Sequence, residues 1–128
     1  SGACWAEVIN KFKDHMFPNI FNMNDLFQAL HGSKVKSVNL SNNRISDVGA
    51  WDIAANLQGT LVEELDLSGN NISDAGARDL IHNLHGTSVR ALNLSRCRIS
   101  SEGAKYLLAN LPSQLISLGL EGNLGLSF

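Results

Sequence analysis

The chain repeats itself at a constant interval of 27 residues. The segments Val35–Leu40, Val62–Leu67 and Val89–Leu94 align, and each has an aliphatic residue at its first, fourth and sixth position. Repeats of this length predict a solenoid, in which each unit packs against its neighbours and the stack presents an extended open surface. Such a surface suits the binding of another macromolecule better than the enclosure of a small substrate.

Each repeat is predicted to contain a strand and then a helix. The first part alternates apolar and polar residues, which is typical of a short strand with one buried face. The second part spaces apolar residues three and four apart, as in Ala77, Leu80, Ile81 and Leu84, which predicts an amphipathic helix.

A polar pair precedes each predicted helix, and a glycine recurs two residues after it. The pairs are Ser46-Asp47, Ser73-Asp74 and Ser100-Ser101. We expect their oxygens to accept hydrogen bonds from the first-turn N–H groups of the helix that follows. The recurring glycine indicates close packing of the backbone at that point.

Agreement across these columns identifies a family resemblance. The strand pattern L-x-x-L-x-L-x-x-N/C-x-I, followed by S-D-x-G-A-x-x-L-x-x-x-L, resembles leucine-rich repeats of the ribonuclease-inhibitor type. Residues 35–111 carry three full copies, and a fourth strand follows in Leu115–Leu120, one residue short of register. The resemblance implies an α/β fold, a right-handed βα solenoid with a parallel sheet on its concave face and helices on its convex face.

The resemblance also implies a ladder of side chains between the repeats. Its Asn/Cys column holds Asn43, Asn70, Cys97 and Asn123, which are expected to bond to backbone groups in the loop after each strand. Cys97 is expected to serve as a weaker hydrogen-bonding substitute for asparagine. A reactive thiol is the alternative, but no base or cation in the sequence is paired with it.

The two ends depart from the repeat. We expect residues 1–34 to form an N-terminal helical cap of the same domain as the repeats in residues 35–128, with a helix over about residues 3–15. Residues 23–31 align with the helical half of a repeat. After the fourth strand little sequence remains, so the last core face is expected to stay partly open, with Leu124, Leu126 and Phe128 able to cover some of it. Two interpretations are open: the chain is a fragment of a longer array, or this end meets another molecule, including a second copy.

Composition excludes several classes of function. Ten basic and twelve acidic residues give a formal charge of −2 without a basic run, which disfavours nucleic acid and anionic membranes as partners. No segment approaches the roughly 18 consecutive apolar residues that span a bilayer. Two cysteines without a disulfide framework favour the cytoplasm, of the producing cell or of a host that receives the protein.

No catalytic, metal or cofactor site is predicted. His82 and His85 lie three residues apart, but no nearby residue completes a metal site with them. No nucleophile with a base, phosphate-binding loop or carboxylate pair stands out. We therefore expect a chain that is not an enzyme and that carries no cofactor.

Alternation along the strands predicts which polar residues lie on the concave face. Asn39, Asn93 and the acidic residues Glu64 and Asp66 point away from the core. Lys36, Glu63 and Arg90 form an edge row of alternating charge, and Arg96 lies beside the third strand. Glu63, Glu64 and Asp66 would make a small acidic centre. Two interpretations remain: a surface that binds a partner, or a solvated face whose opposite charges pair across strands.

Trp51 is a second candidate, on the helix layer. Its column holds Arg78 and Lys105 in the other repeats, so it is expected to face outward. It either rests on the cap helix through Trp5 or Phe12, or anchors a partner.

The leading hypothesis is a module that binds a protein partner. One alternative resembles the GTPase activators built from such repeats, with Arg96 or Arg98 contacting the GTPase. Another is a truncated or engineered repeat scaffold without an activity of its own.

Overall fold

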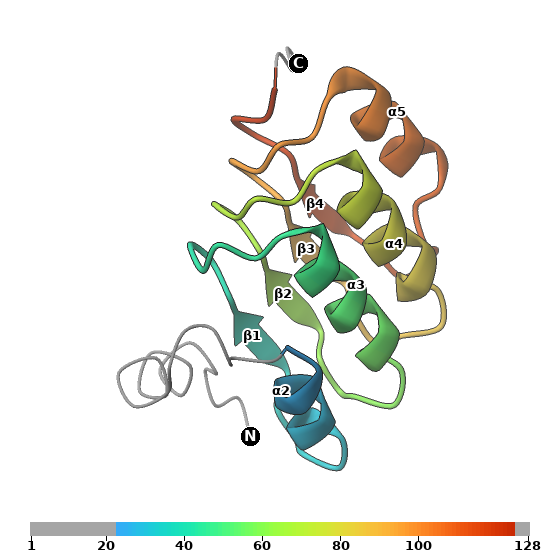
Figure 1. The fold of residues 1–128 in the computed structure, drawn as a ribbon. Helices are drawn as coiled ribbons and strands as arrows, with labels where there is room; N and C mark the ends of the chain where they lie inside the picture. The colour runs from blue at the N-terminus through green and yellow to red at the C-terminus, as the bar shows by residue number, and fades with distance from the viewer. Residues whose placement is uncertain (1–22, 125–128) are drawn as a thin grey trace.

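The computed structural model describes residues 23–124, in which helices and strands alternate along the chain (Figure 1). The elements in chain order are α2 (Met23–Leu30), β1 (Ser37–Asn39), α3 (Asp47–Asn56), β2 (Glu64–Asp66), α4 (Asp74–Leu84), β3 (Ala91–Asn93), α5 (Ser101–Ala109) and β4 (Ser117–Gly119). No helix between Met23 and Leu124 has the length and apolar composition that crossing a bilayer requires.

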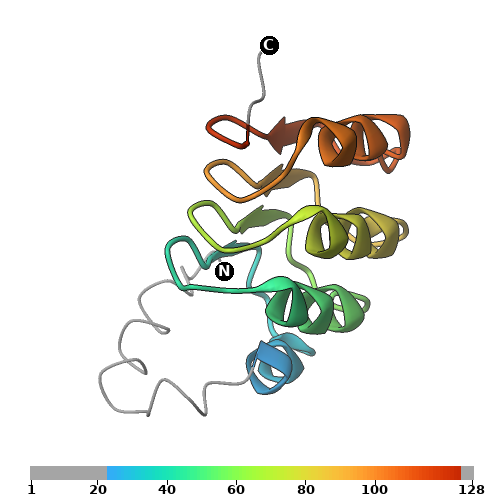
Figure 2. The same ribbon diagram turned by 45° about the horizontal axis from the view of Figure 1, so that its top comes forward.

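The strands form one parallel sheet in sequence order, β1-β2-β3-β4. The register brings the central aliphatic residues Val38, Leu65, Leu92 and Leu118 side by side. The helices lie in a second layer on one side of the sheet, and successive strand–helix units stack on one another (Figure 2). The fold is therefore the predicted α/β solenoid, with a parallel sheet on one face and helices on the other.

The core lies between the sheet and the helix layer. Leu65 and Leu92 from the strands and Ile53, Leu80 and Leu107 from the helices are buried in it. Each strand has only three residues, so its stability depends on this packing more than on strand length.

Helix α2 occupies the place of a repeat helix beside α3. Its Phe27 and Leu30 are fully buried, as their alignment with the helical columns predicts. Gln28 Nε2 donates to Asn56 Oδ1 at 3.2 Å, and His31 Nε2 lies 3.1 Å from Asn56 O. The predicted cap helix over residues 3–15 lies outside the described residues.

Two of the three helix starts differ from the expectation that each polar pair caps its own helix, while Ser100 caps α5 as expected. Neither Ser46 nor Ser73 makes a side-chain bond to its own first turn. Instead, the Asp47 carboxylate accepts hydrogen bonds from Ser73 N at 2.7 Å, Ser73 Oγ and Gly76 N at 3.2 Å, all in the next repeat. The acidic residue of one repeat thus caps the helix of the following one.

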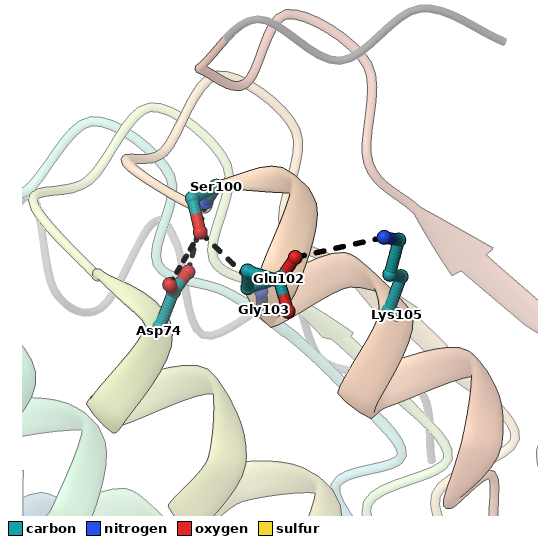
Figure 3. A network of polar contacts seen from close by, with 5 residues as sticks. All are labelled: Asp74, Ser100, Glu102, Gly103 and Lys105. Carbon is teal, nitrogen blue, oxygen red and sulfur yellow. Dashed lines mark hydrogen bonds and ion pairs between the residues drawn. The ribbon is translucent and has the colours of Figure 1, made fainter.

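The next repeat uses a variant of this contact (Figure 3). Asp74 accepts from Ser100 N at 2.8 Å and from Ser100 Oγ, while Ser100 Oγ accepts from Gly103 N at 3.3 Å. A Cβ on Gly103 would overlap the Asp74 carboxylate, and a Cβ on Gly76 would lie 2.5 Å from Asp47 Oδ1. The recurring glycines therefore make room for the carboxylate of the preceding repeat, which is the physical reason for the close packing that the sequence indicates.

Candidate binding surface on the concave face

The strands place polar and small residues on the face of the sheet opposite the helices. This concave face contains a hollow of about 550 Å³. Its lining is Ser37, Val38, Asn39, Glu64, Leu65, Asp66, Ala91, Leu92, Asn93, Ser95, Ser117, Gly119 and Glu121. The floor over β3 and β4 is made of small residues, so a partner can approach the backbone there.

The charge of the hollow has one sign. Glu64, Asp66 and Glu121 contribute three carboxylates, and none of the lining residues is Lys or Arg. Strands β2 and β4 are two strand spacings apart, or about 9.6 Å. The carboxylates therefore lie on both sides of the neutral floor formed by Ala91 and Asn93.

Asp66 is held in place by the turn that follows β2. Its Oδ1 accepts hydrogen bonds from Ser68 N at 3.0 Å and Ser68 Oγ at 2.7 Å. Asn39 makes the same two bonds with Ser41 after β1. Because these bonds use only Oδ1, the other carboxylate oxygen of Asp66 has no partner within residues 23–124 and remains available to a ligand.

The edge row of alternating charge pairs internally. Lys36 Nζ lies 4.0 Å from Glu63 Oε2, and Arg90 Nη1 lies 3.8 Å from Glu63 Oε1. All three side chains are partly or largely exposed, so each pair contributes at most about 1 kcal/mol to stability. Glu63 is placed between two cations and does not line the hollow, which separates it from Glu64 and Asp66.

Glu121 was missed by sequence reasoning, although a signal for it exists. It follows β4 in the column that holds Ser41, Ser68 and Ser95 after the other strands. The register shift of one residue in the fourth repeat hides this match. An acid in a serine column is the feature that would have identified it.

Arg96 has an unusual backbone conformation. Its φ is 52°, in the left-handed region that costs a non-glycine residue about 1 kcal/mol. Glycines hold the equivalent places after β2 and β4, where Gly69 and Gly122 have φ of 69° and 71°. The Arg96 side chain is exposed and stands outside the lining of the hollow, and the Arg98 side chain is also exposed.

Trp51 lies on the outer side of α3, and 56% of it is exposed. Val48, one turn before it, is also exposed, so the two form a small apolar patch on the helix layer. The residues of the predicted cap that would cover Trp51, Trp5 and Phe12, lie outside the described part of the chain.

The Asn/Cys column connects the loops of successive repeats. Asn70 Nδ2 donates to Leu40 O at 3.0 Å and Leu67 O at 2.8 Å, and Asn70 Oδ1 accepts from Asn43 N and Ile45 N, each at 2.9 Å. Asn123 bonds in the same way to the loop after β3: Nδ2 donates to Leu94 O and Leu120 O, and Oδ1 accepts from Ile99 N.

The other two members of the column bond more weakly. Cys97 Sγ contacts Leu67 O at 3.4 Å, and burial raises the pKa of this thiol above its ordinary value. A neutral buried thiol is a poor nucleophile, which fits a structural role. Asn43 Nδ2 donates only to Ser41 O at 3.0 Å, and its buried Oδ1 has no partner among the described residues.

Comparisons with known proteins agree with this architecture. Residues 33–54, 60–80 and 85–108, together more than half of the chain, match the sequence profile described as leucine rich repeat. No curated protein matches the chain. Among solved structures, the leiomodin-1 actin-binding site 2 is similar, with 21% identity and a TM-score of 0.74 over 89% of this chain and 68% of that one. At this identity the likeness shows a shared fold.

Proposed function

We propose, from the premise that this chain belongs to the leucine-rich repeat family, that it is a non-enzymatic module whose concave face binds a basic segment of a protein partner. The observation that carries the proposal is the hollow over β2, β3 and β4, which contains three carboxylates and no cation. Opposite charge steers association and selects partners. The ribonuclease-inhibitor type of repeat, inferred from the strand and helix patterns, belongs to the same proposal.

The bonding of the acidic residues supports a binding role over a merely solvated face. Glu63 already has cations on both sides, whereas none of the ion pairs in residues 23–124 involves Glu64, Asp66 or Glu121. A guanidinium or ammonium group entering the hollow would find three carboxylates, of which Asp66 is fixed by its turn, beside the small residues of β3 and β4. The floor offers no aromatic anchor, so we expect moderate affinity and a strong dependence on salt.

The chain itself supplies neutral replacements for a test. Asp66→Asn copies Asn39 and Asn93, Glu64→Ser copies Ser37 and Ser117, and Glu121→Ser copies the serine column, so each change is already accommodated elsewhere in the stack. The probe is a fluorescent peptide of alternating Arg and Gly, with a Gln-Gly peptide as its uncharged counterpart. Binding is measured by anisotropy at low and at physiological salt.

We expect the triple variant to bind the Arg-Gly peptide at least about tenfold more weakly, since each lost contact between opposite charges near the surface is worth on the order of 1 kcal/mol. Glu102→Gln is the matched control, because Glu102 is an exposed acid on α5 that pairs with Lys105 at 3.5 Å, away from the hollow. Equal affinity of the triple variant and the unchanged chain would refute the proposal.

Actin is the first protein to test, because the similar leiomodin-1 structure carries an actin-binding site by name. Co-sedimentation with filaments and anisotropy with monomeric actin would detect binding, and the triple variant would show whether the hollow is used. If actin does not bind, other proteins with basic segments remain to be tested.

Two further parts of the proposal concern location and activity. We propose a cytoplasmic location, supported by the buried free thiol of Cys97, which is stable in a reducing compartment. The GTPase-activator alternative would rest on the exposed Arg96 and Arg98. Acceleration of GTP hydrolysis by a small GTPase, lost in Arg96→Ala or Arg98→Ala, would replace the non-enzymatic proposal with that alternative.

A further inference from the structure

The hydroxyl group of Ser95 lies in the wall of the hollow without a hydrogen-bond partner. Ser95 lines the hollow and is only 7% exposed, and its Oγ bonds to no group within residues 23–124. The equivalent hydroxyls after β1 and β2, on Ser41 and Ser68, each donate at 2.7 Å to the side chain two residues before them. Buried polar groups in folded proteins are nearly always bonded, because leaving one without a partner costs free energy. The free hydroxyl of Ser95 therefore indicates a contact with a molecule that enters the hollow.

Gly119 leaves the space beside this hydroxyl open. It pairs with Asn93 in the register of β3 and β4, in the column where the other strands carry asparagine or aspartate. A Cβ on Gly119 would lie 2.6 Å from Asn93 Oδ1 and 3.0 Å from Ser95 Oγ. Both oxygens therefore border the space over the Gly119 backbone, which no side chain of that residue fills.

Glu121 adds a negative charge beside the same space. The pairing of β3 with β4 continues past the strands, since Arg96 N donates to Glu121 O at 2.7 Å. This places Glu121 beside Ser95, one strand spacing of about 4.8 Å away. Glu121 lines the hollow and takes part in none of the ion pairs of residues 23–124. Three departures from the repeat thus coincide at one place: a free hydroxyl, a missing side chain and an added carboxylate.

The groups around this space, which we call the Gly119 notch, accept hydrogen bonds. Asn93 Oδ1 keeps a second lone pair besides the one that Ser95 N uses, and the Ser95 hydroxyl oxygen has two. These two acceptors are neutral, and the exposed Glu121 supplies the charge. A guanidinium group suits such a set, because it is planar, weakly hydrated and carries five N–H donors. A lysine ammonium group is compact and strongly hydrated, so it gains less from the neutral acceptors.

We propose that the Gly119 notch binds the guanidinium group of an arginine in the partner segment, with Asn93 Oδ1, Ser95 Oγ and the Glu121 carboxylate as its acceptors. This inference rests on the proposed function of the hollow and adds the residue type that the hollow recognises. The carboxylates of Glu64 and Asp66 attract a lysine as well as an arginine, because they act through charge. The neutral acceptors of the notch therefore supply the selectivity for arginine, while the carboxylates supply most of the attraction.

Two fluorescent peptides separate selectivity from charge. One is the Arg-Gly peptide, and the other is a Lys-Gly peptide of the same length and charge, with binding of each measured by anisotropy. We expect the unchanged chain to bind the Arg-Gly peptide about tenfold more tightly, since hydrogen bonds from a charged donor are among the stronger ones. Ser95→Ala should weaken binding of the Arg-Gly peptide at least about fivefold and leave that of the Lys-Gly peptide unchanged. This variant removes one acceptor and no charge, and it keeps the bond from Ser95 N to Asn93 Oδ1.

Two further variants control and extend the test. Ser41→Ala is the matched control, because Ser41 holds the same place after β1 but lies outside the lining of the hollow, and it should leave both affinities unchanged. Gly119→Ala places a Cβ in the notch and should weaken binding of the Arg-Gly peptide as Ser95→Ala does. Urea unfolding followed by circular dichroism verifies that each variant is folded. In NMR spectra of the ¹⁵N-labelled chain, the Arg-Gly peptide should shift the amides of Ser95 and Gly119 more than the Lys-Gly peptide does.

Two results would overturn the inference alone. They are equal affinities of the unchanged chain for the two peptides, and an unchanged affinity of the folded Ser95→Ala chain for the Arg-Gly peptide. If the triple variant Glu64→Ser/Asp66→Asn/Glu121→Ser still weakens binding of both peptides, the acidic hollow keeps its proposed function and only the recognition of arginine by the notch is wrong. Failure of the unchanged chain to bind either peptide would overturn both proposals.

Discussion

The contact between Asp74 and the following repeat permits a quantitative test of how the repeats hold together. Asp74→Ala removes two hydrogen bonds to a charged carboxylate, from Ser100 N and Ser100 Oγ. Bonds to charged groups contribute about 1.5–3 kcal/mol each when buried. Asp74 and Ser100 are half-buried, so we expect a combined loss of about 2 kcal/mol in the free energy of unfolding.

Gly103→Ala tests the same contact from the other side. Alanine raises helix propensity by about 1 kcal/mol, but its Cβ would overlap the Asp74 carboxylate, and forced overlap typically costs about 1–3 kcal/mol. In the Asp74→Ala background this overlap is gone, and the nearest remaining neighbour is Ile99 Cγ2 at 3.1 Å. The double variant should therefore be more stable than the sum of the two single changes predicts, by about 2 kcal/mol.

Urea unfolding followed by far-UV circular dichroism measures all four proteins of the cycle. With a slope of about 1–3 kcal/mol per molar urea, a change of about 2 kcal/mol moves the midpoint by roughly 1 M. Ser101→Ala is the matched control, because Ser101 occupies the Asp47 and Asp74 column but is exposed, and it should change stability by less than about 0.5 kcal/mol. Additivity of the two changes within about 0.5 kcal/mol would refute the reasoning.

Three further predictions use other columns. Replacement of an asparagine of the Asn/Cys column by alanine should lower the free energy of unfolding most for Asn70, by about 3 kcal/mol, less for Asn123 and least for Asn43. The reason is that Asn70 bonds to backbone groups of two repeats, whereas Asn43 makes one bond. Equal losses for the three variants in urea unfolding would contradict this. Burial raises the pKa of the Cys97 thiol above 9.0, so the thiol ionises first in the unfolded chain. In a Cys4→Ser background, the free energy of unfolding should therefore hold its contribution from the neutral thiol below pH 9 and lose it as the pH rises above 9. The same measurement on Cys97→Ser should not show this decline. Arg96→Gly should raise the free energy of unfolding by about 1 kcal/mol, since glycine adopts a φ of 52° without strain; an unchanged free energy in urea unfolding would show that Arg96 gains a compensating contact.

The sequence predicted most of the fold because its signals are periodic. The aliphatic spacing in Val62–Leu67 and the helical stripe of Leu80, Ile81 and Leu84 each specify an element, and the repetition of both specifies a stack. The direction of strand residues also follows from alternation, which placed Asp66 on the exposed face. What the sequence did not reveal is that the acidic residues at the helix starts bond to the next repeat, since Asp74 and Ser100 meet only after stacking.

The candidate site was predicted less completely for a related reason. Glu63 and Glu64 are adjacent in the sequence, but one lies between Lys36 and Arg90 and the other lines the hollow. The difference depends on cross-strand neighbours, which are set by register. Glu121 was missed because the fourth repeat is shortened by one residue. Alignment at the fixed repeat interval therefore does not place Glu121 in the column of Ser41, Ser68 and Ser95.

Two groups of acidic residues in residues 23–124 therefore differ in what surrounds them after stacking. Asp47 and Asp74 lie beside a glycine of the next repeat and have their oxygens occupied by its backbone and serine groups. Asp66 lines the hollow, with one oxygen fixed by its own turn and the other without a partner within residues 23–124. A carboxylate at a helix start that is followed 29 residues later by a glycine is thus a structural link between repeats. Ser101 stands in the same column but has no carboxylate to make such a link, whereas Glu64, Asp66 and Glu121 line the hollow and take part in none of the ion pairs of residues 23–124.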